Sequence, residues 1–239
     1  MTRTPLPLAI RPVLKAGAIF FLLSFLFKSF QQGGSAGGSL SVPTAHAALK
    51  LSVLVLAVLV GIRSGISLAE IGFFSRKNVR WRALGVAAVL AGAITSIVML
   101  LGQFPRNPLI AQFGVVGFFL QIVLLSSVAE EVLCRGLLQT ELERAFAGRE
   151  RRFGLSYPVW FSGLFFGGLH FSLLGVAAPA TVAMTVAFTV VLGILCALAR
   201  ERTGGMVAPI VVHMLGNVGG IVGGIVMAIG ARIFQGAAL

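Results

Sequence analysis

The stretch SVAEEVLCRGLLQ, residues 127–139, places two adjacent carboxylates, Glu130 and Glu131, at the end of a long apolar run. The chain has seven acidic residues, and we expect this pair to be the one embedded in a membrane. An ionisable side chain inside a bilayer is costly, so it marks a functional site by default. The pair is therefore the first candidate site.

The composition predicts a membrane protein. Of the 239 residues, 57% are hydrophobic and 11% are charged, which excludes an ordinary soluble domain. A transmembrane β-barrel is excluded too, because it needs alternating segments of about ten residues and the apolar runs here are continuous. The predicted fold class is all-α: a polytopic membrane helical bundle of about seven transmembrane helices, or eight, with no separate soluble domain.

The apolar runs predict the individual spans. We expect helices at residues 12–30, 47–62, 83–102, 109–125 with an amphipathic continuation to 147, 157–174, 181–199 and 206–229. The first run follows a basic leader, as in a signal peptide. The nearest small-residue cleavage pattern, at 45–47, lies about twenty residues further on, so we expect an uncleaved first span. Residues 31–43, QQGGSAGGSLSVP, predict a flexible Gly/Ser-rich linker.

The basic residues predict the orientation in the membrane. Four of the nineteen fall on one side of this layout, and the other fifteen fall on the side that contains the N-terminus. The four are Lys28, Lys50, Arg106 and Arg232. The positive-inside rule therefore predicts a multi-pass protein of the cell membrane with a cytoplasmic N-terminus and an external C-terminus. It also explains the net charge of +12 without nucleic-acid binding.

Helical spacing predicts different roles for the two glutamates. Glu131 and Arg135 are four residues apart, with the acid on the N-terminal side, which favours an intrahelical ion pair. Glu130 is rotated by about 100° from its neighbour and has no basic residue at i+3 or i+4. We therefore expect Glu130 to lack an ionic partner and to suit a general acid or base. The alternative is that both carboxylates only form hydrogen bonds with neighbouring helices.

Two later spans carry further polar side chains. In FFGGLHFS, residues 165–172, His170 lies four residues after Phe166 on the same helix face, and Gly167 and Gly168 permit close approach of another helix. The two cysteines, Cys134 and Cys196, lie in apolar helical contexts and are expected to be packing residues.

The seventh span contains HMLGN, residues 213–217, in which His213 and Asn217 share one helix face. A lone histidine in a helix is more often a hydrogen-bonding group than a catalyst. Two histidines, a carboxamide and a glutamate on three spans instead indicate one small site. The third histidine, His46, is interpreted as a linker residue.

Three of these patterns resemble motifs of a known family. EEVLCR is similar to a Glu-Glu-x-x-x-Arg motif, FGGLH to Phe-x-x-x-His and HMLGN to His-x-x-x-Asn, in the order seen in the CPBP family. That family comprises the CAAX prenyl endopeptidases and the bacterial bacteriocin-processing or immunity (Abi) proteins. The resemblance covers residues 127–220. It divides the chain into N-terminal membrane spans, 1–108, and a CPBP-like catalytic helical core, 109–239.

The resemblance implies an intramembrane endopeptidase of glutamic type that acts on a membrane-associated protein or peptide in the lipid bilayer, with no cofactor. Glu130 and His170 would activate a water molecule. His213 and Asn217 would resemble an oxyanion hole. Three residues would give structural support to this site, and they are Glu131, Arg135 and Phe166.

Two other functions remain open at this point. Two histidines and one glutamate would also form a catalytic zinc set, although the sequence contains no H-E-x-x-H motif. A non-catalytic immunity or scaffold protein would retain the same polar residues as structural contacts. No residue pattern selects a prenylated substrate, and the Gly/Ala/Val/Arg usage is typical of a bacterial inner-membrane protein. No oligomeric state is predicted.

Helix rise predicts where these groups meet. Counted from the expected span ends at about 1.5 Å per residue, Glu130, His170, His213 and Asn217 converge within about 10 Å of one another, near the middle of the membrane or on its cytoplasmic side. Hydrolysis at that depth needs water. We therefore expect a polar cavity among the fourth, fifth and seventh spans that opens to the cytoplasm.

Overall fold

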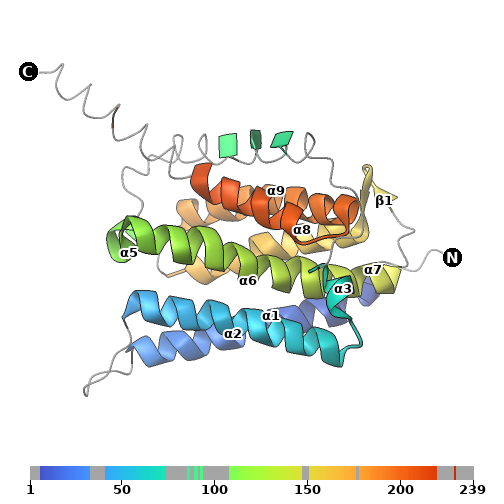
Figure 1. Ribbon diagram of the computed structural model, residues 1–239, viewed down its shortest axis with the longest axis horizontal. Coiled ribbons are helices and arrows are strands. Elements are labelled where there is room, and N and C mark those ends of the chain that lie inside the picture. The colour runs from blue at the N-terminus through green and yellow to red at the C-terminus, as the bar shows by residue number, and fades with distance from the viewer. Residues whose placement is uncertain are drawn as a thin grey trace, which may run out of the picture.

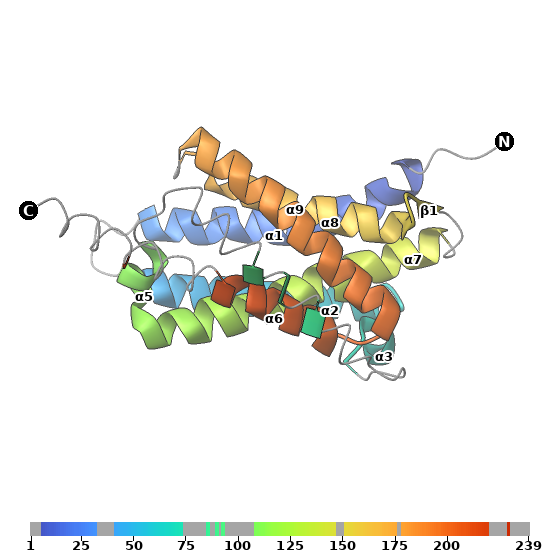
Figure 2. The same cartoon turned by 90° about the horizontal axis from the view of Figure 1, so that it is seen from above.

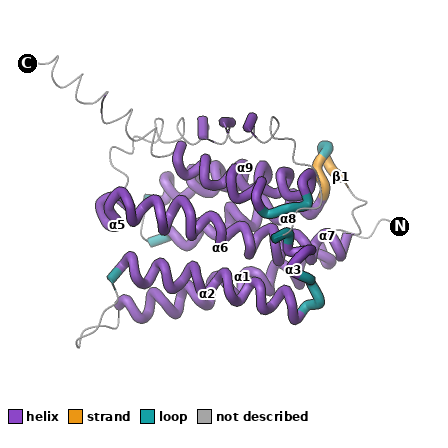
Figure 3. Tube along the Cα trace, viewed as in Figure 1, coloured by secondary structure: helices purple, strands orange, loops and turns teal. Residues whose placement is uncertain are grey.

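The computed structural model describes residues 6–32, 41–73, 85–86, 89–90, 92–93, 108–146, 151–175, 178–219 and 229. Almost all of the described chain is helical (Figure 3), which confirms an all-α membrane bundle. Four described helices are long and apolar enough to cross a membrane: Ala9–Ser29, Val42–Arg63, Phe113–Phe146 and Pro179–Thr203. They correspond to four of the seven expected spans. The expected span at 83–102 and the second half of the span at 206–229 lie largely outside the described residues.

The first two helices pack against each other and against the centre of the bundle. Helix α1 covers Leu6–Gln32, and α2 covers Val42–Arg63. The Ser41 side chain caps α2 by accepting a hydrogen bond from the Thr44 amide, and Pro43 occupies the first turn, where it needs no backbone partner. Helix α2 thus begins five residues before the expected position. The end of the predicted linker is wrong, and His46 is a helix residue.

A long, nearly continuous helix forms the centre of the molecule. It consists of α5 (Pro108–Phe118), a π-helical segment (Phe119–Ser126), α6 (Ser127–Glu131), a second π-helical segment (Val132–Gln139) and α7 (Thr140–Phe146). In Figure 1 this helix lies between a layer of α1 and α2 and a layer of α8 and α9. Residues 131–140 are all buried, as expected of a helix enclosed on every side. The glutamate pair lies between the two π-helical segments, a type of helix often found at functional sites.

A short hairpin that the sequence did not indicate precedes the last helices. Strands β1 (Arg151–Arg152) and β2 (Leu155–Ser156) pair antiparallel around Phe153 and Gly154, which both have positive φ. Helix α8 then covers Tyr157–Leu169 and continues as a 3₁₀ turn, His170–Leu173. At 13 residues, α8 is shorter than the expected span and than the roughly 20 residues that cross a bilayer.

Helix α9 (Pro179–Thr203) crosses α8 obliquely (Figure 2) and at close range. A Cβ atom added to Gly193 would lie 2.9 Å from the Gly163 carbonyl oxygen, and one added to Gly167 would lie 3.1 Å from the Val186 oxygen. The prediction that Gly167 permits close approach is confirmed. The same prediction for Gly168 is wrong, because a Cβ there meets open space. Gly163 takes that role instead, in a small-xxx-small pattern typical of membrane helices.

The last described helix is Val207–Gly219.

At one end of the bundle, the start of α1 meets the ends of α2 and α7. Lys15 pairs with Glu141 and donates to Ser64, while Arg144 donates to the Ser64 carbonyl oxygen. Both cysteines are free and buried, as expected of packing residues.

Candidate active site

The centre of the site is a fully buried ion pair. Arg135 Nη1 donates to Glu131 Oε1 at 3.0 Å, and neither side chain is accessible to solvent. The pair predicted from the four-residue spacing is therefore confirmed. The same Oε1 atom lies 2.9 Å from Nδ1 of His213, which the helix Val207–Gly219 brings into the bundle. Because a carboxylate only accepts hydrogen bonds, this contact places a proton on Nδ1 of His213.

Arg135 is itself held by the crossing of α8 and α9. Its Nη2 donates to the Gly193 carbonyl oxygen at 2.5 Å, and its guanidinium lies 4.8 Å from the centre of the Phe166 ring. The glycine contacts between α8 and α9 bring this carbonyl and this ring to the same place. The supporting role that the motif implied for Phe166 thus has a structural counterpart in a cation–π contact.

Glu130 is not without an ionic partner, and that expectation is wrong. Its Oε1 forms an ion pair with Nζ of Lys50, and its Oε2 lies 3.9 Å from Nε2 of His213. The partner comes from α2, eighty residues earlier in the chain. Spacing along one helix cannot show such a contact.

The N-terminal half of α2 supplies two side chains to the site. Lys50 is 7% exposed, so it lies inside the bundle and not in a connection on the outer side, which corrects its assignment from the basic residues. One turn earlier, Nε2 of His46 lies 3.3 Å from Ser126 Oγ. A signal for Lys50 was present in the sequence, because it is an ionisable residue within an apolar span.

His170, the histidine of the Phe-x-x-x-His motif, lies where α8 becomes a 3₁₀ turn. Its Nδ1 lies 3.1 Å from the Phe166 carbonyl oxygen, and the Phe166 ring meets the rings of both His170 (5.4 Å) and His213 (5.1 Å) edge-on. A carbonyl only accepts, so this contact places a proton on Nδ1 and leaves a lone pair on Nε2 in the neutral ring. His170 is close enough to Glu130 to act on it electrostatically, although no hydrogen bond joins them within the described chain.

Asn217 contacts the helix that carries the glutamates about one and two turns before them. Its Nδ2 donates to Ser127 Oγ at 3.1 Å and to the Ile122 carbonyl oxygen at 3.3 Å. Both amide hydrogens are therefore used in this structure. The structure thus joins Glu130, Glu131, Arg135 and His213 by direct contacts and holds His170 and Asn217 at the edges of the same cluster. Within the described ranges, no group of three or more potential ligands could hold a metal ion.

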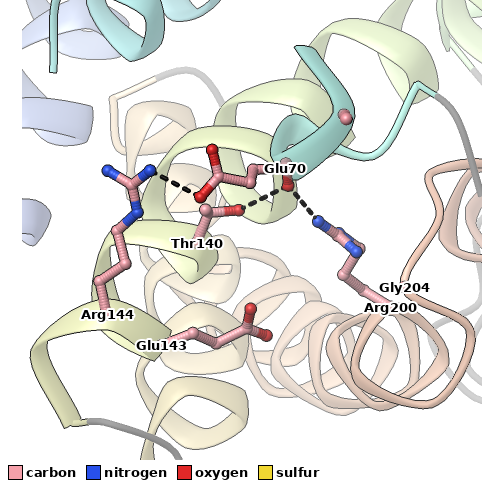
Figure 4. A pocket seen from close by; sticks show the side chains of 7 residues that line it. Glu70, Thr140, Glu143, Arg144, Arg200 and Gly204 are labelled. Atoms are coloured by element: carbon pink, nitrogen blue, oxygen red, sulfur yellow. Dashed lines mark hydrogen bonds and ion pairs between the residues drawn. The ribbon is translucent and has the colours of Figure 1, made fainter. Parts of the chain in front are cut away.

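A separate pocket of about 390 Å³, seen from close by in Figure 4, is lined mostly by polar side chains. Its lining residues are Ala69, Glu70, Thr140, Glu143, Arg144, Arg200 and Gly204. Glu70 belongs to the short helix α3 (Leu68–Ile71) and pairs with Arg144 at 2.7 Å, and this hydrogen bond lowers the pKa of Glu70 to about 2. Arg200 and Thr140 both donate to the Glu70 carbonyl oxygen. Thr140 lies about 15 Å along the helix from Glu130, so these contacts tie α3 to α7 and α9 away from the candidate site.

Comparison with known proteins connects the site to one family. Residues 112–219 match the family model described as Rce1-like, type II CAAX prenyl endopeptidase Rce1-like. No curated protein and no solved structure gives a significant match. The match confirms the resemblance predicted from the three motifs and contains all of their residues. Lys50 and His46 lie outside it.

Proposed function

We propose that the chain is an intramembrane endopeptidase that hydrolyses a peptide bond of a membrane-associated protein or peptide, using a water molecule activated by Glu130 and His170. The match to the Rce1-like model supports a CAAX-type membrane protease at the level of the family. The observation that carries the mechanism is the placement of Glu130 between Lys50 and His213 in the interior of a membrane bundle.

Glu130 has the properties of a general base. One of its oxygens is engaged by Lys50, and the other lies 3.9 Å from Nε2 of His213, so one reacting oxygen atom could lie within hydrogen-bonding distance of both groups. His170 complements it, because the lone pair on Nε2 can accept a hydrogen bond from the same water. The water oxygen would attack the peptide carbonyl carbon while its proton passes to Glu130. Collapse of the tetrahedral intermediate would then break the C–N bond, and the proton would move to the leaving amine nitrogen.

His213 and Asn217 are the proposed donors to the oxyanion. Glu131 fixes the imidazole of His213 through Nδ1, so that Nε2 faces the Glu130 side and donates when the ring is protonated. Asn217 would have to exchange its hydrogen bond to Ser127 for one to the substrate oxygen. Glu131, Arg135 and Phe166 would keep the geometry and would not touch the reacting atoms.

We further propose that the N-terminus is cytoplasmic. The basis is the excess of basic residues on its side of the layout, together with the meeting of the start of α1 and the ends of α2 and α7 at one end of the bundle.

The test is Glu130→Gln in the full-length protein reconstituted in liposomes. The panel of substrates contains a farnesylated peptide ending in a CAAX sequence, the same peptide without the lipid, and proteins that co-purify with the Glu130→Gln variant from native membranes. We expect the wild type to cleave at least one of them and Glu130→Gln to cleave none, because the amide keeps the shape and loses the base. Glu201→Gln, which removes a half-exposed ion pair with Arg151, is the control and should retain activity. Cleavage by Glu130→Gln at the wild-type rate would reject the proposal.

A further inference from the structure

We infer that Lys50 is a positioning residue of this site: its ammonium group holds the Glu130 carboxylate charged and directs its second oxygen toward His213. Helix α2 then supplies a residue of the site, although this helix lies outside the segment that matches the family model. The inference rests on the proposed function and assigns a role to a residue that none of the three motifs contains.

The first observation is the depth of Lys50. It follows the start of α2 by eight residues, which places it about 12 Å along the helix. Its side chain is 9% exposed. An ammonium group in such surroundings is costly unless a counter-charge accompanies it. Within the described residues, Glu130 is the carboxylate that lies in ion-pairing distance of Lys50. The ammonium also lies 5.6 Å from the centre of the Phe20 ring, which adds a cation–π contact from α1.

The second observation is the register of α2 against the central helix. His46 meets Ser126 and Lys50 meets Glu130, so both contacts have the same separation of eighty residues. Two helices with a constant offset run parallel, and Figure 1 shows α2 beside the central helix. Two adjacent turns of α2, at His46 and Lys50, therefore contact two adjacent turns of the central helix, at Ser126 and Glu130. This arrangement fixes the position of the ammonium group.

The third observation concerns the other charges around Glu130. The titratable groups around it are Lys50 and His46 from α2, His170 from the end of α8, His213 from the helix Val207–Gly219, and Glu131 and Cys134 on its own helix. Arg135, the nearest guanidinium on that helix, is committed to Glu131 and Gly193. Within the described residues, Lys50 is thus the basic side chain in direct contact with the carboxylate. A buried carboxylate without such a neighbour binds a proton more readily, which lowers the fraction of the charged form that can act as a base at a given pH.

The test compares Lys50→Met and Lys50→Arg in the full-length protein in liposomes, with the pH dependence of kcat/KM as the readout. We expect Lys50→Met to lose about tenfold or more in kcat/KM at neutral pH and to move the acidic limb of the profile upward by about one pH unit or more. Lys50→Arg should keep the wild-type shape of the profile, because it retains the charge. Lys15→Met is a matched control, since Lys15 forms another interhelical Lys–Glu pair, with Glu141, away from the site.

The outcomes separate this inference from the proposed function. Activity of Glu130→Gln would reject the function itself. An inactive Glu130→Gln together with an unshifted acidic limb in Lys50→Met would leave the function standing and overturn the role of Lys50. If Lys50→Met is too unstable to purify, Lys50→Gln keeps a hydrogen-bond donor and removes only the charge. A shifted limb in that variant supports the inference, and an unshifted limb rejects it.

Discussion

His213 Nδ1 and Arg135 Nη1 converge on the same oxygen atom, Oε1 of Glu131, at 2.9 Å and 3.0 Å. One buried carboxylate oxygen therefore orients both the imidazole that faces Glu130 and the guanidinium that contacts α8 and α9. Glu131 thus supports the geometry of the site, whereas Glu130 is the proposed general base. The adjacent glutamates are distinguished by what surrounds them.

Glu131→Gln should destabilise the protein. It leaves Arg135 buried beside a neutral amide, and removal of one partner from a buried ion pair costs roughly 3–5 kcal/mol. A large decrease in Tm in detergent is expected, together with loss of activity through misorientation of His213. Glu141→Gln, which affects the part-buried pair with Lys15, should have a smaller effect on Tm. Equal decreases in the two variants would contradict a special role for Glu131.

Gly167→Ala should destabilise the crossing of α8 and α9, because the added Cβ would lie 3.1 Å from backbone atoms of α9. The expected loss is about 1–3 kcal/mol, as for other overpacked contacts. Gly168→Ala is the matched control: its Cβ meets open space, and alanine favours the helix more than glycine does. Thermal unfolding of the two variants in the same detergent provides the measurement. A stable Gly167→Ala would show that the helices can separate at no cost.

Active protein should contain no stoichiometric metal. Both carboxylates that could belong to a zinc set are engaged in ion pairs, Glu131 with Arg135 and Glu130 with Lys50. Elemental analysis of purified active protein should give well under one metal per chain, and o-phenanthroline should inhibit weakly. Stoichiometric zinc whose removal abolishes cleavage would favour a metalloprotease instead.

Position 217 should be reachable by water from the cytoplasmic side. With Cys134 and Cys196 replaced by serine, Asn217→Cys should react with a membrane-impermeant maleimide added to inside-out vesicles. The predicted polar cavity would bring water to this depth. A cysteine introduced at Val53, which is fully buried, is the negative control. Labelling from the opposite side of the membrane alone would reject both the orientation and the access route.

The sequence predicted the parts of the site that depend on a single helix. The Glu131–Arg135 pair follows from helix geometry, and the apolar runs predicted the four long helices that the structure describes. The Lys50–Glu130 pair could not be predicted in this way, because it depends on the packing of α2 against a segment eighty residues away.

Other differences between the prediction and the structure arose where local sequence signals were ambiguous or misleading. The Gly/Ser-rich run before α2 suggested that the linker continues to Pro43. The Ser41 cap and the proline that follows it are nevertheless a recognisable helix start, and they bring His46 into the bundle. The hairpin at 151–156 was missed because Phe153 adopts a positive φ, which a bulky residue rarely does.

The His46–Ser126 and Lys50–Glu130 contacts have the same offset along the two helices. The position of α2 along its axis therefore determines which of its side chains meets Glu130. A shift of α2 by one turn, about 5.4 Å, would bring His46 opposite Glu130 in place of Lys50. An ammonium group, which only donates hydrogen bonds, would then be replaced by an imidazole, which in its neutral form has one donor and one acceptor. The position of α2 along its own axis therefore decides which kind of hydrogen-bonding group the carboxylate meets.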